Sequence, residues 1–297
     1  SDIVKKNLIK KSIKKLRKKN IVEEGYLEPP KGEENLNWKK TKKLIFKSTL
    51  FGDDTNRSLQ KDDGTWTYFA NDLAYHTNKI SRKFDYLINV LGADHTGYIK
   101  RITSAVKAVS NDRVKLICKV CQLVKLYKNG QPFKMSKRLG DFISVDDLLK
   151  EVNKDSIRFM MLNRGNDVEL DFDFNKFLEK NKDNPVFYVQ YCYARINSLF
   201  RSLNLNLNKE IKIDKNNFKL NDYDLRLMRK IIEWPKVLDI ASKKLEPHRV
   251  TFYLYDLATI FHSYWSEGNK NDKYKFIING KINKKISFKI FQLLSII

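Results

Sequence analysis

The sequence predicts an α/β domain followed by an all-helical bundle, and two observations support this fold class. Up to about residue 174, short strand-like apolar runs alternate with segments of helical spacing. Among them, residues 86–91 are almost continuously apolar, which is typical of a strand covered on both faces of a parallel sheet. Beyond residue 174, long segments with apolar residues at helical spacing predominate. Hydrophobic residues make up 42% of the chain, which excludes intrinsic disorder.

The chain begins with a predicted basic helix at residues 5–20. Ile9, Ile13 and Leu16 recur at helical spacing and form one apolar stripe, while lysines fill the remaining positions. Such lysines suit either the solvated face of a packed helix, which we favour, or an RNA-binding arm.

Two strands and a helix are expected next. The strands are predicted at residues 44–50 and 65–69, and the second follows a turn at residues 62–64. Asn71 can cap a helix that runs over residues 72–82.

The apolar strand predicted at residues 86–91 is followed by the polar residues Asp94 and His95. In open α/β sheets, ligands bind at the carboxyl ends of strands, so both side chains are candidate ligand contacts. For His95, a packed structural role remains equally open. The chain is expected to return as a strand at residues 114–127, and Asn129 with Gly130 predicts a hairpin after it.

The helical part is expected to begin at Pro185, because proline favours the first helical turn. Two further helices are predicted: one kinks near Pro235, and the other begins at Pro247. Three side chains share one side of the first helix: Tyr188, Tyr191 and Arg195. Aromatic and guanidinium groups suit unstacked RNA bases and phosphates, although packing of the tyrosines against a neighbouring helix is an alternative.

The charge balance points to a polyanionic partner. Lys and Arg number 58 against 35 Asp and Glu, a formal charge of +23. Nucleic acid is favoured over a membrane surface, although an AT-rich genome can explain part of the excess. No apolar run approaches the ~20 residues of a membrane span. Three cysteines exclude a disulfide scaffold and indicate a cytoplasmic protein. Cys118 and Cys121 lack a second pair of ligands, so no zinc or other metal site is expected.

A loop with two lysines carries the clearest chemical signal. Lys134 and Lys137 flank Met135 and Ser136, just after the predicted hairpin. Two mobile cations in a loop can bind a triphosphate. Alone, the tetrapeptide is a weak signal in a lysine-rich chain.

The chain resembles arginyl-tRNA synthetases, which are class I enzymes, through an ordered set of segments that covers nearly its whole length. These segments are GYLEPPKG (25–32), FGDD (51–54), WTYFANDLAYH (66–76), GADHTGY (92–98), KMSK (134–137), DNPVFYVQY (183–191) and EPHR (246–249). The resemblance implies part of a nucleotide-binding, Rossmann-like core followed by an anticodon-binding helical bundle. It also implies that arginine and ATP, with Mg²⁺, form arginyl-adenylate, and that the arginyl group then passes to the terminal ribose of tRNA(Arg).

The resemblance further implies roles for individual residues. Lys137 would neutralise charge on the ATP phosphates, with Lys134 and Ser136 assisting. ATP-binding positions are Met135, Lys137, Asp94 and His95. Tyr68, Asp72 and His95 match the arginine pocket, where a carboxylate can pair with a planar guanidinium. For Asp72, stabilisation of a helix N-terminus is the alternative. Tyr188, Tyr191 and Arg195 fall in the anticodon-binding part.

One family signature is missing: none of the four histidines forms a His-x-Gly-His pair. We therefore expect a carboxy-terminal fragment with the second part of the catalytic domain at residues 1–140, connecting helices at 141–174 and a truncated anticodon-binding domain at 175–297. The complete enzyme is expected to be a monomer. The alternatives are a non-catalytic tRNA-binding module derived from such an enzyme and, much less favoured, a nucleotide-binding protein of unrelated fold.

Overall fold

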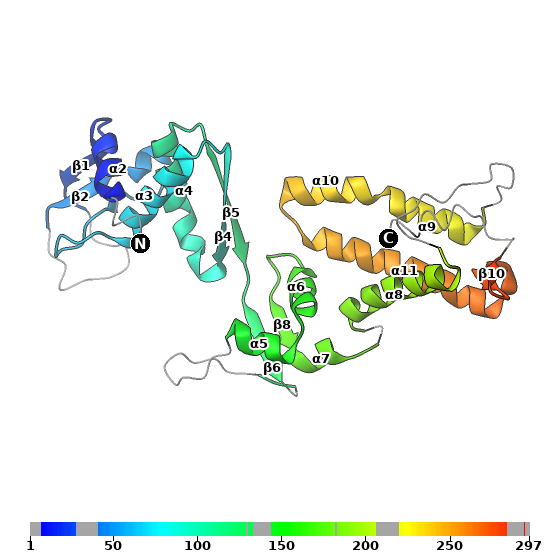
Figure 1. Ribbon diagram of the computed structural model, residues 1–297. Helices are drawn as coiled ribbons and strands as arrows, with labels where there is room; N and C mark the ends of the chain where they lie inside the picture. Colours follow the sequence, from blue (N-terminus) through cyan, green and yellow to red (C-terminus); the bar gives the residue numbers. More distant parts are fainter. Residues whose placement is uncertain are drawn as a thin grey trace. The chain divides into compact units, whose positions relative to one another are not determined.

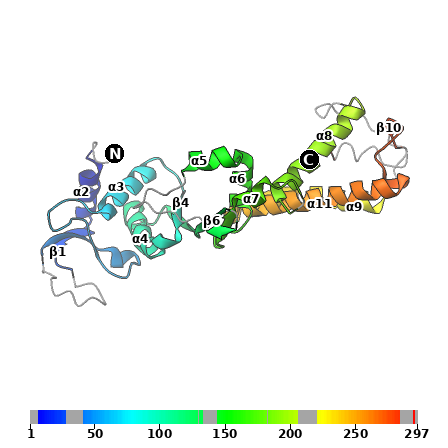
Figure 2. The same cartoon turned by 90° about the horizontal axis from the view of Figure 1, so that it is seen from below.

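The computed structural model describes residues 7–27, 41–128, 130–132, 144–181, 183–205, 220–283 and 294. Its internal contacts divide the chain into unit 1, Ser1–Leu123, and unit 2, Val124–Ile297. Each unit has its own strands, helices and hydrophobic core (Figures 1 and 2). The domain boundaries expected at residues 140 and 174 stay predictions.

A small antiparallel sheet and helix α2 share one core in unit 1. The sheet order is β1-β2-β3, and the strands are β1 (Val22–Gly25), β2 (Lys43–Phe46) and β3 (Arg57–Ser58). Helix α2 (Leu8–Arg17) buries Ile9, Ile13 and Leu16 against this core. The predicted apolar stripe is thereby confirmed.

Helix α3 (Tyr68–Ser81) starts four residues earlier than expected, so the prediction of a strand at residues 65–69 is wrong. The hydroxyl of Thr67 accepts a hydrogen bond from the Ala70 amide and caps the helix. The strand predicted at 44–50 also ends early, because the 3-10 helix η1 (Ser48–Phe51) follows β2.

Two parallel strands form the second sheet of unit 1. Strand β4 (Tyr86–Gly92) pairs with β5 (Lys115–Cys121), and the 3-10 helix η2 (Ala93–Tyr98) and helix α4 (Ile99–Ser110) connect them. Figures 1 and 2 both draw α4 beside α3, and the two helices are in contact.

Strand β4 is covered on one face only. Leu87 is 4% exposed, whereas Ile88 and Val90 are 47% and 69% exposed. The expectation of a strand buried on both faces is therefore wrong for the described residues. An apolar sheet face is left open in unit 1.

The strand predicted at residues 114–127 is two strands that belong to different units. β5 ends at Cys121, and β6 (Val124–Lys128) pairs antiparallel with β7 (Gln131–Pro132), which confirms the hairpin. β6 also pairs parallel with β8 (Leu170–Asp173). Three short helices complete this part of unit 2: α5 (Val145–Glu151), α6 (Lys154–Leu162) and α7 (Phe174–Leu178).

The helical bundle has the predicted order of elements. Its helices are α8 (Pro185–Ser202), α9 (Asp222–Ile232), α10 (Trp234–Lys244) and α11 (His248–Lys270). The 3-10 helix η3 (Asp272–Tyr274) and the hairpin of β9 (Ile277–Ile278) and β10 (Lys281–Ile282) follow. Helix α11 contacts α8, α9 and α10, and Phe261 and Tyr264 lie fully buried between them. Instead of a kink at Pro235, α9 ends and α10 begins there.

Candidate functional site

Asp72 and Tyr98 meet at the carboxyl end of β4. The Tyr98 hydroxyl, in the last residue of η2, donates a hydrogen bond to Oδ2 of Asp72 on α3 at 2.5 Å. Burial and the neighbouring carboxylate raise the pKa of Tyr98, so the hydroxyl keeps its proton as donor. Among the described residues, Oδ1 of Asp72 has no hydrogen-bond partner, and the residue is half-buried.

Tyr68 lies on the same face of α3 as Asp72. Residues four apart on a helix are neighbours, and the early start of α3 places both in its first two turns. The Tyr68 side chain is 86% exposed. A phenol and a carboxylate therefore project together from one accessible helix face.

A chain of hydrogen bonds anchors this face of α3 to β4. Nδ1 of His76 bonds the backbone carbonyl of Asp72 at 2.8 Å, and Nε2 lies 3.0 Å from the side-chain amide of Asn89. Asn89 in turn accepts from Lys79 at 3.0 Å. Burial lowers the pKa of both His76 and Lys79. The chain fixes the turn of α3 that carries Asp72.

Asp94 and His95 are both solvent-accessible at the end of β4. His95 Nε2 lies 3.5 Å from Asp94 Oδ2. The His95 side chain is 62% exposed and the Asp94 side chain is 72% exposed. The alternative of a packed structural histidine at His95 is therefore wrong. The ligand-binding roles of both residues stay predictions.

A buried ion pair supports the loop before β3. Both carboxylate oxygens of Asp53, whose side chain is fully buried, accept from Arg57 at 2.7 and 2.8 Å. Arg57 holds the pKa of Asp53 below its usual value despite burial.

Arg101 lies beside the Asp72–Tyr98 pair. Its guanidinium stacks over the Tyr98 ring, 5.2 Å from the ring centroid, and its Nε has no hydrogen-bond partner among the described residues.

The Lys-Met-Ser-Lys loop cannot be placed against these residues. Lys134, Met135, Ser136 and Lys137 lie outside the residues that the structure describes. Their predicted phosphate-binding roles stay predictions.

Unit 2 carries a separate cluster of aromatic and cationic side chains on α8 and α11. The Arg195 guanidinium lies 4.2 Å from the Tyr191 ring centroid and 5.2 Å from that of Trp265. It also donates to the Tyr191 hydroxyl at 3.1 Å and to Nδ1 of His262 at 3.0 Å. We call Tyr191, Arg195, His262 and Trp265 the α8–α11 cluster.

The third residue predicted for this surface lies deeper. The Tyr188 ring packs against Tyr255 and His262, with centroids 5.3 and 4.5 Å apart. Tyr191 is 41% exposed and stacks on Phe187 at 5.6 Å. Of the three predicted residues, Tyr191 and Arg195 thus form the accessible pair, and Tyr188 supports them.

Sequence reasoning assigned no role to three residues that build these sites. Tyr98 and His76 fall inside segments recognised by resemblance, and His262 lies at helical spacing from Tyr255 and Thr259 on α11. Their side-chain partners Asp72, Asn89 and Arg195 are distant in sequence, and only the position of Tyr98 in the segment that follows β4 gave a signal.

The described residues hold no group of three His, Cys, Asp or Glu side chains arranged to bind a metal ion. Cys118, Cys121 and Cys192 are free, and burial raises the pKa of Cys118. Within the described part of the chain, no helix is long and apolar enough to span a bilayer.

Comparison with known proteins places these features in a family. A model of the catalytic domain of tRNA synthetases class I (R) matches residues 4–197, and a DALR anticodon binding domain model matches residues 189–285. The arginine–tRNA ligase of Pelagibacter ubique is 57% identical over 287 residues, or 97% of this chain and 49% of that protein. That of Ruegeria pomeroyi is 49% identical over 281 residues, or 92% and 48%.

Structural comparison supports the same fold. The arginyl-tRNA synthetase of Thermus thermophilus matches 99% of this chain and 55% of its own, with a TM-score of 0.64 and 18% identity. An α/β catalytic part followed by a helical anticodon-binding domain is the architecture of a class I tRNA synthetase. The chain belongs to the arginyl-tRNA synthetase family of this class. It spans about half the length of the curated relatives that it matches.

Proposed function

We propose that the chain is part of an arginine–tRNA ligase. In the first step, the arginine carboxylate attacks the α-phosphorus of ATP, and arginyl-adenylate forms as pyrophosphate leaves. In the second step, a hydroxyl of the terminal ribose of tRNA(Arg) attacks the arginyl carbonyl, and AMP leaves. A cytoplasmic location and a monomeric complete enzyme belong to the same proposal, since they follow from the family resemblance.

The pairing of Asp72 with Tyr98 is the observation that carries this proposal. A carboxylate binds a guanidinium through charge-assisted hydrogen bonds, which are roughly twice as strong as neutral ones. Tyr98 fixes one oxygen of Asp72, and the accessible face that Asp72 shares with Tyr68 leaves room for a ligand. We assign Asp72 the contact with the arginine side chain and Tyr68 a place beside it.

ATP is assigned to the carboxyl end of β4 and to the Lys-Met-Ser-Lys loop. Ligands of open α/β sheets bind at this edge, where Asp94 and His95 are exposed. Lys137 would balance charge that develops on the phosphates, with Lys134, Met135 and Ser136 in the same loop. Mg²⁺ fits this assignment because it usually binds through one or two carboxylates together with substrate phosphates, and Asp94 offers such a carboxylate.

The α8–α11 cluster is assigned to the anticodon loop of tRNA. Unstacked bases bind to aromatic and guanidinium planes. Tyr191 and Arg195 present such planes on the accessible side of α8, within the region matched by the anticodon-binding model. His262 and Trp265 hold Arg195 in position from α11.

The open face of β4 favours a second candidate, in which this chain alone binds tRNA without catalysing the reaction. Ile88 and Val90 form an apolar surface that further residues of a catalytic sheet can cover. We infer that unit 1 by itself holds an incomplete catalytic site.

Arginine charging of total tRNA tests both candidates, with tRNA binding measured in parallel. We expect charging by a longer protein in which a segment containing a His-x-Gly-His motif precedes this chain. For the chain alone, we expect tRNA binding without charging. Charging by the chain alone contradicts the second candidate, and no charging by either protein contradicts the first.

A further inference from the structure

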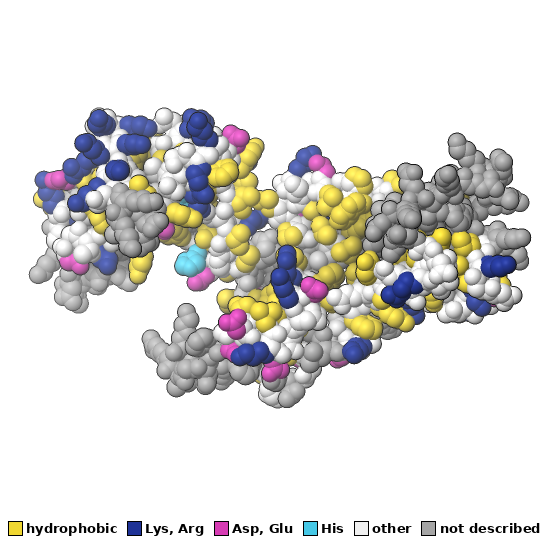
Figure 3. All heavy atoms as spheres, in the orientation of Figure 1, with side chains coloured by type: hydrophobic (Ala, Val, Ile, Leu, Met, Phe, Trp, Pro, Cys, Tyr) yellow, Lys and Arg dark blue, Asp and Glu magenta, His cyan; other side chains and the backbone are white. Residues whose placement is uncertain are grey.

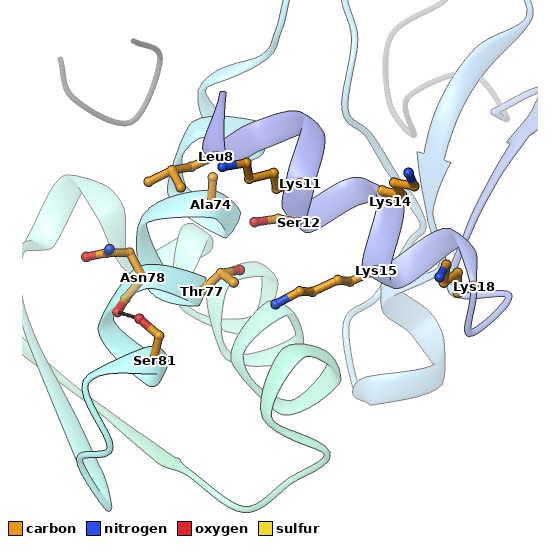
Figure 4. Close-up of a pocket in the computed structure, with 10 residues that line it drawn as sticks. All are labelled: Leu8, Lys11, Ser12, Lys14, Lys15, Lys18, Ala74, Thr77, Asn78 and Ser81. Carbon is orange, nitrogen blue, oxygen red and sulfur yellow. Dashed lines mark hydrogen bonds between the residues drawn. The ribbon is translucent and has the colours of Figure 1, made fainter. Parts of the chain in front are cut away.

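A groove lined by lysines runs along α2 and α3 in unit 1, apart from the Asp72 site. Its first part is a hollow of about 370 Å³ between the two helices (Figure 4). Two adjoining hollows of about 290 and 500 Å³ continue it toward the end of α4 and share Lys15 and Thr77 with the first. We call these three hollows the α2–α3 groove.

Four lysines of the first hollow are available to a ligand. Lys11, Lys14, Lys15 and Lys18 line the first hollow and are exposed, and none forms an ion pair within the described part of the chain. Figure 4 shows Lys15 reaching from α2 toward Thr77. By contrast, Arg17 on the same helix is paired with Glu24 at 3.0 Å.

The surrounding charge is strongly positive. Helix α2 contains no acidic residue, and Lys83 and Arg113 line the far hollow. Among the described residues that line the three hollows, Asp85 is the one carboxylate. Figure 3 shows Lys and Arg side chains gathered over the region of unit 1 that carries α2.

Polar groups of α3 line the opposite wall. Thr77, Asn78 and Ser81 line the first hollow, and in Figure 4 the Thr77 side chain lies nearest Lys15, whereas the Asn78 side chain points away from α2 and the Ser81 hydroxyl turns toward the Asn78 carbonyl. Thr77 and Ser81 donate to backbone carbonyls of Leu73 and Asn78 at 2.8 and 2.7 Å. The single proton of each hydroxyl is therefore used within α3, so the lysines of α2, and not these hydroxyls, supply the donors for an anion.

We propose that the α2–α3 groove binds the sugar–phosphate backbone of RNA. Lysines on flexible stems act as point charges that contact phosphates irrespective of base sequence. A membrane surface fits less well, because the apolar face of α2 is already buried: Ile9, Ile13 and Leu16 are 3%, 5% and 2% exposed. The inference rests on the proposed tRNA ligase function and adds a second RNA-binding surface, in unit 1.

The test compares two double variants of the full chain in tRNA binding over a range of salt concentrations. Lys11→Gln with Lys15→Gln removes two charges from the groove. Lys10→Gln with Lys61→Gln removes two charges from exposed positions of unit 1 that do not line it. All four side chains are exposed, so thermal unfolding of both variants is expected to match that of the parent.

We expect the groove variant to bind total tRNA about tenfold more weakly at low salt, with a salt slope shallower by about two. The control variant should lose much less. Equal losses in both variants, or no loss in the groove variant, overturn the inference. Lysine-dependent binding to phosphatidylserine vesicles in place of tRNA also overturns it.

Tyr191→Ala separates this inference from the proposed function. If that variant binds tRNA more weakly while the groove variant binds normally, the groove inference fails and the ligase proposal stands. If the parent chain does not bind tRNA at all, the groove inference and the second candidate fail, and charging by the longer protein decides the ligase proposal.

Discussion

His76 donates from Nδ1 to the backbone carbonyl of Asp72 at 2.8 Å, because a carbonyl oxygen can only accept a hydrogen bond. Its Nε2 then accepts from the side-chain amide of Asn89 at 3.0 Å. Both contacts are satisfied by one neutral tautomer, and a second ring proton would break the bond to Asn89. This residue therefore couples the position of Asp72 to the neutral state of an imidazole.

Acid should loosen α3 through His76. Burial lowers the pKa of His76 in the folded chain below its ordinary value of 6.5, so the unfolded chain binds the proton more readily. The stabilisation that depends on neutral His76 is thus fully present above about pH 6.5 and is lost as the pH falls through the lowered pKa of the folded chain. Amide hydrogen exchange of α3 should quicken over this range in the parent and change less in His76→Gln. An equal response in both proteins contradicts this account. His262, whose pKa burial also lowers, remains in both and provides an internal control in unit 2.

The buried Asp53–Arg57 pair should stabilise unit 1 strongly. Replacing Asp53 with Ala leaves the guanidinium of Arg57 unpaired, which costs about 3 kcal/mol when a buried pair is broken. Asp54→Ala removes the exposed bond to Lys100 and should cost much less, because solvent screens an exposed pair. Urea unfolding, followed by hydrogen exchange of unit 1 peptides, measures both. Similar free-energy losses for the two variants would refute the importance of the buried pair.

Tyr191→Ala should weaken tRNA binding through loss of a stacking surface. Base–aromatic stacking is worth about 1–3 kcal/mol, which corresponds to an affinity loss of about 5- to 150-fold. Tyr193, which is 59% exposed, lies two residues away on a different side of α8 and offers a matched control. Anisotropy titrations of labelled tRNA(Arg) compare Tyr191→Ala with Tyr193→Ala. Equal affinities for the two variants argue against the α8–α11 cluster as an RNA-binding surface.

Lys137→Ala should slow adenylate formation in the complete enzyme and leave tRNA affinity nearly unchanged. A lysine that neutralises phosphate charge acts mainly in the transition state of the first step, and its loss is expected to cost about 10²-fold or more in rate. Pyrophosphate exchange, run with tRNA present at the same concentration for variant and parent, measures this step. Equal turnover by variant and parent removes Lys137 from the reaction.

The order of elements was predictable because it depends on local apolar spacing. The apolar stripe of α2, the start of α8 at Pro185 and the hairpin after β6 follow from patterns of a few residues. The start of α3 could not be predicted in this way, because Trp66, Thr67 and Tyr68 have high strand propensity, whereas Thr67 acts as a helix cap.

The site was predictable only in part. A carboxylate at Asp72 was found by resemblance, but its bond to Tyr98 joins residues 26 positions apart, and spacing alone does not reveal such contacts. The division of residues 114–127 into β5 and β6 likewise depends on which strand each pairs with, β4 in one unit and β8 in the other. Tertiary pairing therefore decided what local propensity left open.

The most direct test of the arginine site is the Michaelis constant for arginine in pyrophosphate exchange by the complete enzyme carrying Asp72→Asn. A neutral amide cannot form a charge-assisted pair with guanidinium, so the constant should rise about tenfold or more, with the constant for ATP nearly unchanged. Asp54→Asn, which removes an exposed carboxylate elsewhere in unit 1, should behave like the parent. An unchanged arginine constant in Asp72→Asn would contradict the assignment of this carboxylate to the substrate guanidinium.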